Sequence, residues 1–501
     1  MHSQGPIVVD GHSLTKEQII AVARGNAKVV LDEETRSKLQ TLWEEFQKAV
    51  EEKIEEANVL ALQHKEGSLS KKEFGIKLKQ KMIYGVTTGF GAMKTAYAKT
   101  QEDAKKLQKN LILSHSSGVG ERLNGETVRA AMLLRANTLA SGYCGVRLQV
   151  VDRLIDLLNN DILPVVPAQG SVGASGDLAP LAHLALGIIG EGPITYKGEE
   201  FYCLEALKGK YPNEFDNIPS TFDLSYKEGL ALINGTTVMT AIATLAYWDA
   251  KHLLDWADSI GAITLDALLG STRAFDEVVY TVYHHEGAKE SARNILSMVQ
   301  GSFLVNQYDS VHDPYSLRCI PQLHGSARDA LDFIGKQLDR HLNSVTDDPL
   351  FFSLGEVSSH PPFDGLNDRY CFEEGHFHGA PIGHIMDLLS IIIADLGAMS
   401  ERRTQMLLDE NHNRGLPSCL IDNPDNINSG YMIAQYTAAA LVSENKSLSH
   451  PASVDSVPTS ANTEDHVSMG MIAARKARKV VDNVYNVFGI ELLCSTEALS
   501  Y

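Results

Sequence analysis

The C-terminal half of the chain contains long stretches of alanine, leucine, isoleucine and valine, and these limit the fold more than any other feature. Five such stretches cover residues 236–269, 327–342, 382–408, 430–446 and 466–487. Helices this long, with apolar residues on more than one face, bury against several neighbours rather than one. The sequence therefore predicts a mainly α protein built on a long-helix bundle, and such a bundle favours assembly into oligomers.

The N-terminal part has a different character, and we expect a smaller mixed region at 1–225 before the bundle at 226–501. Residues 6–9 form a candidate strand, and Thr15 and Gln18 have the spacing of a capping box that opens a helix. Apolar residues recur at three- and four-residue steps between residues 32 and 56, which predicts an amphipathic helix.

Composition excludes several classes of function. The 501 residues are 44% hydrophobic, enough for a large core, and the formal net charge of -19 argues against a surface that binds nucleic acid. The six cysteines form no CxxC pair, so neither a disulfide framework nor a zinc ribbon is expected. Asp387 and Asp395 interrupt an apolar stretch, and the start of the chain has no targeting pattern. We expect a cytoplasmic enzyme with no membrane or nucleic-acid partner.

A group of short motifs indicates the chemistry. The tripeptide Ala174-Ser175-Gly176 follows a loop rich in proline and glycine; such a tripeptide alone is usually a flexible turn. Its companions change that interpretation: Tyr84-Gly85-Val86-Thr87-Thr88-Gly89-Phe90-Gly91, Asn234-Gly235-Thr236, Asp313-Pro314-Tyr315-Ser316-Leu317-Arg318, Phe377-His378-Gly379 and Thr463-Glu464-Asp465-His466.

These blocks, in this order and over most of the chain, resemble the aromatic amino acid ammonia-lyases, with motifs nearest to the histidine-specific members. The resemblance implies that Ala174, Ser175 and Gly176 cyclise into 4-methylideneimidazol-5-one (MIO), with no metal or external cofactor. Glycine allows close approach of the backbone, and serine carries a β-hydroxyl that can leave. The resemblance also implies a homotetramer in which each active site is drawn from more than one subunit.

The same resemblance assigns roles to single residues. Tyr84 would be the catalytic base, and Arg318 would bind the substrate carboxylate through two hydrogen bonds. Tyr315 and Asn234 would lie near the electrophile, with His312 and Phe377 in the substrate site. His115, preceded by Ser114, and Glu464 match the histidine-specific members. The expected reaction is the non-oxidative deamination of L-histidine to urocanate and ammonia by a carbon-nitrogen lyase.

Four positions depart from the histidine-specific pattern: His312 and Thr463 replace glutamines, and Asp348 and His376 replace asparagines. They leave open an aminomutase, a tyrosine or phenylalanine ammonia-lyase, and a catalytically silent relative. A metal site on His376 and His378, or on His284 and His285, lacks a third ligand at a recognisable spacing. Ser175 as a hydrolase nucleophile lacks the glycine-serine elbow.

Overall fold

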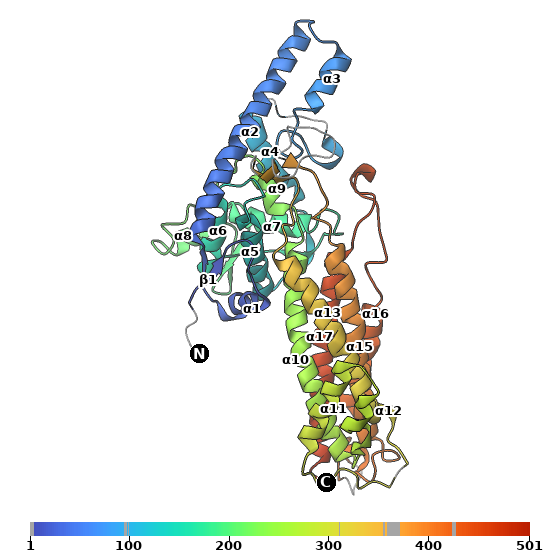
Figure 1. Cartoon of the computed structure of the whole chain (residues 1–501). Helices are drawn as coiled ribbons and strands as arrows, with labels where there is room; N and C mark the ends of the chain where they lie inside the picture. Colours follow the sequence, from blue (N-terminus) through green and yellow to red (C-terminus); the bar gives the residue numbers. More distant parts are fainter. Residues whose placement is uncertain are drawn as a thin grey trace. The chain divides into compact units, whose positions relative to one another are not determined.

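The chain is mainly α-helical and divides into two compact units (Figure 1). The computed structural model describes residues 5–94, 98, 100–309, 311–353, 356–357, 371–422 and 427–501. Unit 1 comprises Met1–Ala241, Asp339–Pro381 and Ser453–Ile472, and unit 2 comprises Ile242–Leu338, Ile382–Ala452 and Ala473–Tyr501. Each unit therefore combines segments that are distant in the sequence. The expected division at residue 225 stays a prediction.

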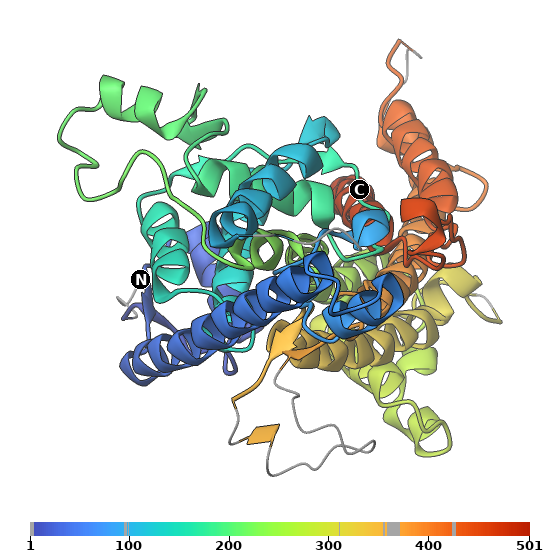
Figure 2. The same ribbon diagram turned by 90° about the horizontal axis from the view of Figure 1, so that it is seen from above.

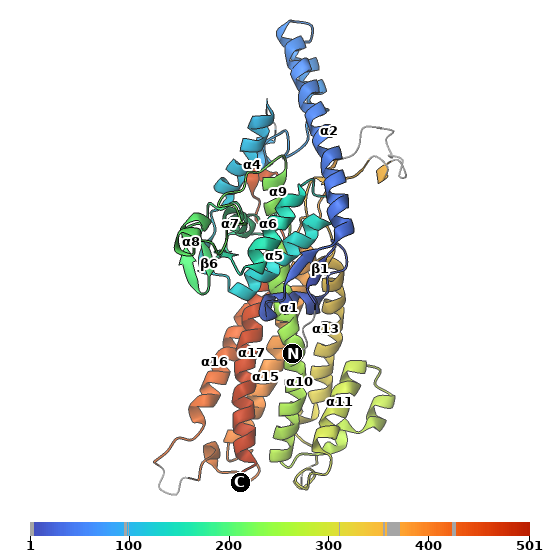
Figure 3. The ribbon, with the colours of Figure 1, turned by 90° about the vertical axis from the view of Figure 1, so that its left-hand side faces the viewer.

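Unit 2 holds most of each of the five long helices in the C-terminal half of the chain. Its long helices run side by side in the views of Figures 1 and 3: α10 (Thr237–Ala267), α13 (Ile320–Leu342), α15 (Ala380–Leu408), α16 (Met432–Leu448) and α17 (Gly470–Ala498). Shorter elements complete the unit: η2 (Thr272–Phe275), η3 (Glu277–Thr281), α11 (Glu286–Val299), α12 (Tyr315–Arg318) and η4 (Ser418–Leu420). These bounds agree with the mainly α bundle that the apolar stretches predict.

Buried charged groups hold the helices of unit 2 in register. Arg403 of α15 forms two hydrogen bonds to Glu491 of α17, at 2.5 and 2.8 Å, and both side chains are fully buried. Thr264 of α10 donates to the same carboxylate at 2.7 Å. Because a charge without a partner is strongly disfavoured in the interior, this network fixes how three helices face one another.

Helix α15 is long and apolar enough to cross a bilayer by length and composition. More than half of its most apolar window is buried inside the protein, as in the core helices of globular proteins. Asp387 within it accepts a hydrogen bond from the backbone N–H of Ala452.

Unit 1 is a mixed region of helices and short strands. Its helices are α1 (Lys16–Gly25), α2 (Glu33–Lys65), α3 (Lys71–Lys79), α4 (Gln101–His115), α5 (Gly125–Ala140), α6 (Leu148–Asn159), α7 (Leu178–Ile188), α8 (Leu204–Lys210) and α9 (Glu228–Ile233), with the 3-10 turns η1 (Gly91–Met93) and η5 (Ser460–Asn462). The capping box of Thr15 and Gln18 is present at the start of α1, as predicted. The predicted amphipathic helix is α2, which buries a stripe that includes Leu39, Phe46 and Val50.

Among the described residues of unit 1, four small sheets brace the helices. Strands β1 (Ile7–Val9) and β2 (Val29–Leu31) pair in parallel, and β3 (Val119–Arg122) pairs antiparallel with β5 (Pro167–Gln169). Strands β4 (Leu163–Pro164), β6 (Ile194–Tyr196) and β7 (Glu199–Phe201) form an antiparallel sheet, and β8 (Leu350–Phe351) pairs with β9 (Cys371–Phe372). The β6–β7 hairpin and α8, drawn green, lie at an edge of unit 1 (Figure 2).

We predict that Glu491→Gln lowers the free energy of unfolding by about 3 kcal/mol, because it leaves the Arg403 guanidinium buried opposite a neutral amide. The thermal midpoint of unfolding measures the effect. Glu277→Gln is the control: it removes an exposed ion pair with Arg293 and is expected to change stability by less than about 1 kcal/mol. Equal midpoints for the two variants would contradict this account of the bundle.

Candidate active site

The loop at residues 171–177 makes an unusually close approach to a second segment of unit 1. Gly176 has φ +73°, and a Cβ built on it would lie 2.0 Å from the carbonyl oxygen of Gly235. The N–H of Asp177 donates to that same oxygen at 2.7 Å, and the N–H of Gly235 donates to the Ser175 carbonyl at 3.3 Å. Only glycine, lacking Cβ and tolerating positive φ, allows this contact at position 176.

Side chains on both flanks fix the loop further. Ser171 Oγ donates to the carbonyl oxygen of Gly176 at 2.9 Å. The fully buried Asp177 accepts from the N–H of Met239 at 2.7 Å, and burial raises the pKa of Asp177 to about 7. From near the end of the chain, Ser468 Oγ donates to the Gly173 carbonyl at 2.9 Å. The tripeptide is thus a turn held by hydrogen bonds on both sides rather than a flexible one.

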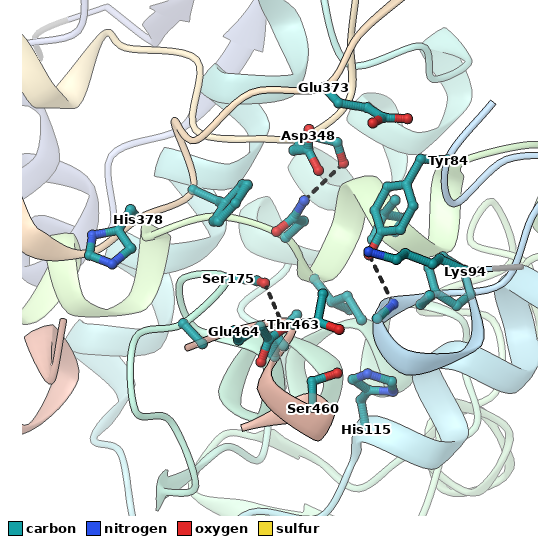
Figure 4. Close-up of a pocket in the computed structure, with 18 of the residues that line it drawn as sticks. Tyr84, Lys94, His115, Ser175, Asp348, Glu373, His378, Ser460, Thr463 and Glu464 are labelled. Carbon is teal, nitrogen blue, oxygen red and sulfur yellow. Dashed lines mark hydrogen bonds between the residues drawn. The ribbon is translucent and has the colours of Figure 1, made fainter. Parts of the chain in front are cut away.

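Ser175 opens into a cavity of about 570 Å³ that lies within unit 1. Figure 4 shows the side chains around it. Six of the side chains singled out from the sequence line the cavity with Ala174: Tyr84, His115, Ser175, Asn234, Phe377 and Glu464. They come from loops and helix ends that are far apart in the sequence, and the fold brings them together.

Tyr84 lies on the segment between α3 and η1. Its hydroxyl oxygen accepts a hydrogen bond from the N–H of Gly91 at 3.0 Å. Burial raises the pKa of Tyr84, and the nearby carboxylates of Asp348, Glu464 and Glu373 raise it further. The phenol is therefore largely protonated at neutral pH, and the fraction of phenolate increases as pH rises.

His115 is the last residue of α4. Its Nδ1 lies 2.9 Å from the carbonyl oxygen of Leu111, which can only accept, so Nδ1 carries a proton. Burial lowers the pKa of His115, which favours the neutral ring and leaves Nε2 as an acceptor. Glu464, just beyond η5, accepts from Ser175 Oγ at 3.2 Å and from Thr459 Oγ1 at 2.8 Å.

The cavity is strongly acidic. Its lining contains five carboxylates, those of Asp348, Glu373, Glu374, Glu464 and Asp465. Lys94 is the only lysine or arginine among the described residues that line it. Sequence reasoning marked Asp348 as a departure but missed Glu373 and Glu374, although they immediately precede the segment that carries Phe377.

Three residues singled out from the sequence belong to unit 2 and are absent from the described lining of this cavity: His312, Tyr315 and Arg318. His312 and Arg318 line another cavity, of about 410 Å³, and Tyr315 is 72% exposed. The Arg318 guanidinium lies 5.5 Å from the centre of the Tyr315 ring. Their expected roles at Ser175 stay predictions.

The candidate metal ligands do not form a centre. In the described part of the chain, no three histidine, cysteine, aspartate or glutamate side chains are grouped to hold a metal ion. The ring of His378 stacks on that of His466, with centroids 5.9 Å apart. Nδ1 of His376 lies 3.4 Å from Oε2 of Glu374.

Comparison with known proteins identifies the family. The family model described as aromatic amino acid lyase matches residues 73–501. The chain belongs to the aromatic amino acid lyase family. Among members of this family, the histidine ammonia-lyase of Caldanaerobacter subterraneus subsp. tengcongensis is 46% identical over 497 residues, covering 99% of this chain and 88% of the relative. Histidine ammonia-lyase 2 of Fusobacterium nucleatum is 44% identical, with the same coverage of each chain.

Solved structures of the aromatic amino acid lyase family share the fold. The tyrosine aminomutase from Streptomyces globisporus has a TM-score of 0.83 at 34% identity, and the match covers 99% of this chain and 88% of that one. The histidine ammonia-lyase from Trypanosoma cruzi has a TM-score of 0.78 at 33% identity, covering 99% of this chain and 85% of that one. Lyases and aminomutases thus share this architecture, and the chemistry must be argued from the site.

We predict that Gly176→Ala destabilises the protein by on the order of 3 kcal/mol, because the added methyl group meets the Gly235 carbonyl. Gly198→Ala is a matched control: Gly198 has φ +80°, but nothing lies within 4 Å of the added Cβ. The control is expected to lose only about 1 kcal/mol, from backbone strain. Thermal unfolding compares the two, and similar losses would show that the contact with Gly235 is unimportant.

Proposed function

We propose that the protein removes ammonia from L-histidine to give urocanate, using MIO formed from Ala174, Ser175 and Gly176. One observation supports this proposal most strongly. Around one cavity lie the Ser175 hydroxyl, the Tyr84 phenol, the neutral His115 ring and the Glu464 carboxylate. The names of the relatives at 44 to 46% identity support the same substrate.

The residues of the loop fit the ring closure. In that reaction the Gly176 nitrogen attacks the Ala174 carbonyl carbon, and two water molecules leave, one of them with the Ser175 hydroxyl. The tight turn at Gly176 and the hydrogen bonds from Ser171 and Gly235 restrict the tripeptide to few conformations, which lowers the entropic barrier to an internal attack. Once formed, MIO supplies an electrophilic methylene that draws electrons from the substrate amine.

Tyr84 is the proposed base. Deamination requires removal of a weakly acidic β-proton, and a phenolate facing the same cavity as Ser175 is a suitable acceptor. The burial and the carboxylates that raise the pKa of Tyr84 also strengthen its phenolate as a base. The rate is expected to rise with pH as the phenolate fraction increases.

His115 and Glu464 are the proposed recognition groups for the imidazole ring. Both present acceptors: Nε2 of the neutral His115 and the carboxylate of Glu464. An imidazole offers one N–H donor when neutral and two when protonated, whereas a phenyl ring offers none. A phenyl ring would leave these acceptors without partners, which disfavours phenylalanine.

Arg318 is the proposed partner of the substrate carboxylate, with Tyr315 and His312 beside it. These residues belong to unit 2, so we propose that another copy of the chain supplies them in a homotetramer. Among the described residues that line the cavity in unit 1, Lys94 is the only lysine or arginine that could pair with the substrate carboxylate. This supports the proposal that Arg318 supplies a second positive charge. We also propose a cytoplasmic protein without nucleic-acid or membrane partners, and the net charge of -19 disfavours binding to nucleic acid.

We predict that Ser175→Ala abolishes deamination, because the methylene carbon derives from the serine side chain. The intact mass of the wild-type chain is expected to be two water molecules below the encoded mass, whereas the variant can lose only the water of ring closure. Ser37→Ala, at an exposed position on α2 outside the cavity, is the control and is expected to retain the methylene. A wild-type chain of encoded mass that still deaminates histidine would refute the MIO proposal.

We predict that His115→Phe and Glu464→Gln each lower kcat/KM for L-histidine by about tenfold or more, since the first removes the Nε2 acceptor and the second replaces the charged carboxylate by a neutral amide. Activity towards L-phenylalanine is expected to rise or stay constant in His115→Phe. Steady-state kinetics with histidine, tyrosine and phenylalanine, with product identification, measure this. Unchanged preference in both variants would remove their proposed role, and β-histidine as the main product would favour the aminomutase.

A further inference from the structure

Two oxygen atoms beside the Ser175 cavity have no hydrogen-bond partner although they are buried. Asn234 is only 3% exposed; its Nδ2 donates to the backbone carbonyl of Asp348 at 2.9 Å, and its Oδ1 has no partner. Oε1 of Glu374 is likewise buried without a partner, while Oε2 accepts from the N–H of His376. Unpartnered buried acceptors are costly, so native proteins rarely keep them without a ligand.

Negative charge gathers at the same place. Asp348 is 7% exposed, and its Oδ1 accepts the N–H of Glu374 at 2.9 Å. The nearby cation Lys227 is already paired with Asp347 at 2.5 Å. Burial raises the pKa values of Asp348 and Glu374 to about 7, so a cation beside them would favour their ionised forms. Asp348 and Glu373 lie across the cavity from Glu464 in Figure 4.

The missing partner must donate hydrogen bonds and carry positive charge. When ionised, the carboxylates of Asp348 and Glu374 only accept, as does the amide oxygen of Asn234, and all three groups line the cavity. A small cation with several N–H donors satisfies all of them, whereas a carboxylate or a phenyl ring satisfies none. The deamination itself produces such a cation in this cavity.

We propose that Asp348, Glu374 and Asn234 form a binding site for the ammonium ion that the reaction releases. The inference rests on the proposed function. Atoms and charge balance: zwitterionic histidine gives the urocanate anion and ammonium. The Cα–N bond breaks and a double bond forms between Cα and Cβ. Ammonium leaves with the three hydrogens of the α-amino group and a fourth that balances the proton taken from Cβ.

The site also explains a departure from the family pattern. Asp348 stands where the resemblance leads one to expect asparagine, and the exchange adds one ionisable oxygen with little change in shape. An asparagine there would offer a neutral amide in place of a carboxylate. This chain is therefore expected to hold ammonium more tightly than a protein with the asparagine, and to be inhibited by it at lower concentration.

The test is product inhibition of histidine deamination, measured separately for ammonium and for urocanate. We expect Asp348→Asn and Glu374→Gln each to raise the inhibition constant for ammonium by on the order of tenfold, and to change that for urocanate less than about twofold. Asp156→Asn is the matched control: this aspartate lies on α6, outside the cavity, and burial also raises its pKa. Potassium chloride at equal ionic strength controls for general charge effects.

Three results would overturn the proposal. The first is that ammonium and potassium inhibit the wild-type enzyme equally. The second is that the variants are active and ammonium inhibits them as it inhibits the wild type. The third is that the variants lose ammonium binding and urocanate binding to the same extent. Thermal unfolding provides a second measurement that needs no turnover. Ammonium is expected to raise the midpoint of the wild-type protein more than potassium does, and Asp348→Asn to abolish the difference. If the protein does not deaminate histidine, the proposed function is rejected. The shift of the unfolding midpoint by ammonium would then still decide whether the ammonium site exists.

Discussion

The contact between Gly176 and Gly235 is the constraint on which the site depends. The carbonyl oxygen of Gly235 would lie 2.0 Å from a Cβ at position 176, so no residue other than glycine fits there. The N–H of Asp177 donates to the same oxygen and joins the two segments that contain Gly176 and Gly235. This contact places Ser175 at the cavity and sets Asn234, one residue before Gly235, beside it. Arg135, fully buried, holds the Asn234 carbonyl from α5 at 2.6 Å. The positions of the reactive loop and of Asn234 thus share one cause.

Sequence reasoning found the features that local patterns encode. The apolar stretches predicted the long helices, and the spacing of Leu39, Phe46 and Val50 predicted α2, because helical periodicity is visible in the order of residues. The motifs carried many of the cavity residues, among them Tyr84, Ser175 and Glu464, since each motif keeps its functional residue on a loop or helix end of fixed geometry. Their grouping within unit 1 agrees with the interpretation, while the role of each residue remains a proposal.

Other features depend on distance and burial, which the order of residues does not reveal. Glu373 and Glu374 resemble ordinary surface acids in the sequence, and only the fold turns them towards Asp348 and Asn234. Arg318 lies in unit 2, and its motif does not indicate at which cavity its side chain acts. The pairing of Lys227 with Asp347 decides which carboxylates remain uncompensated, and that too is a property of the folded chain.

The brace that Ser468 and Met469 form on the reactive loop sets the order of events during synthesis. Ser468 donates to the Gly173 carbonyl and the N–H of Met469 donates to Val172, so the loop gains support from a segment 295 residues later in the chain. A nascent chain that has not yet reached this segment lacks these contacts. The loop is therefore fully supported only after that later segment is made, so the proposed cyclisation would follow the assembly of the surrounding cavity.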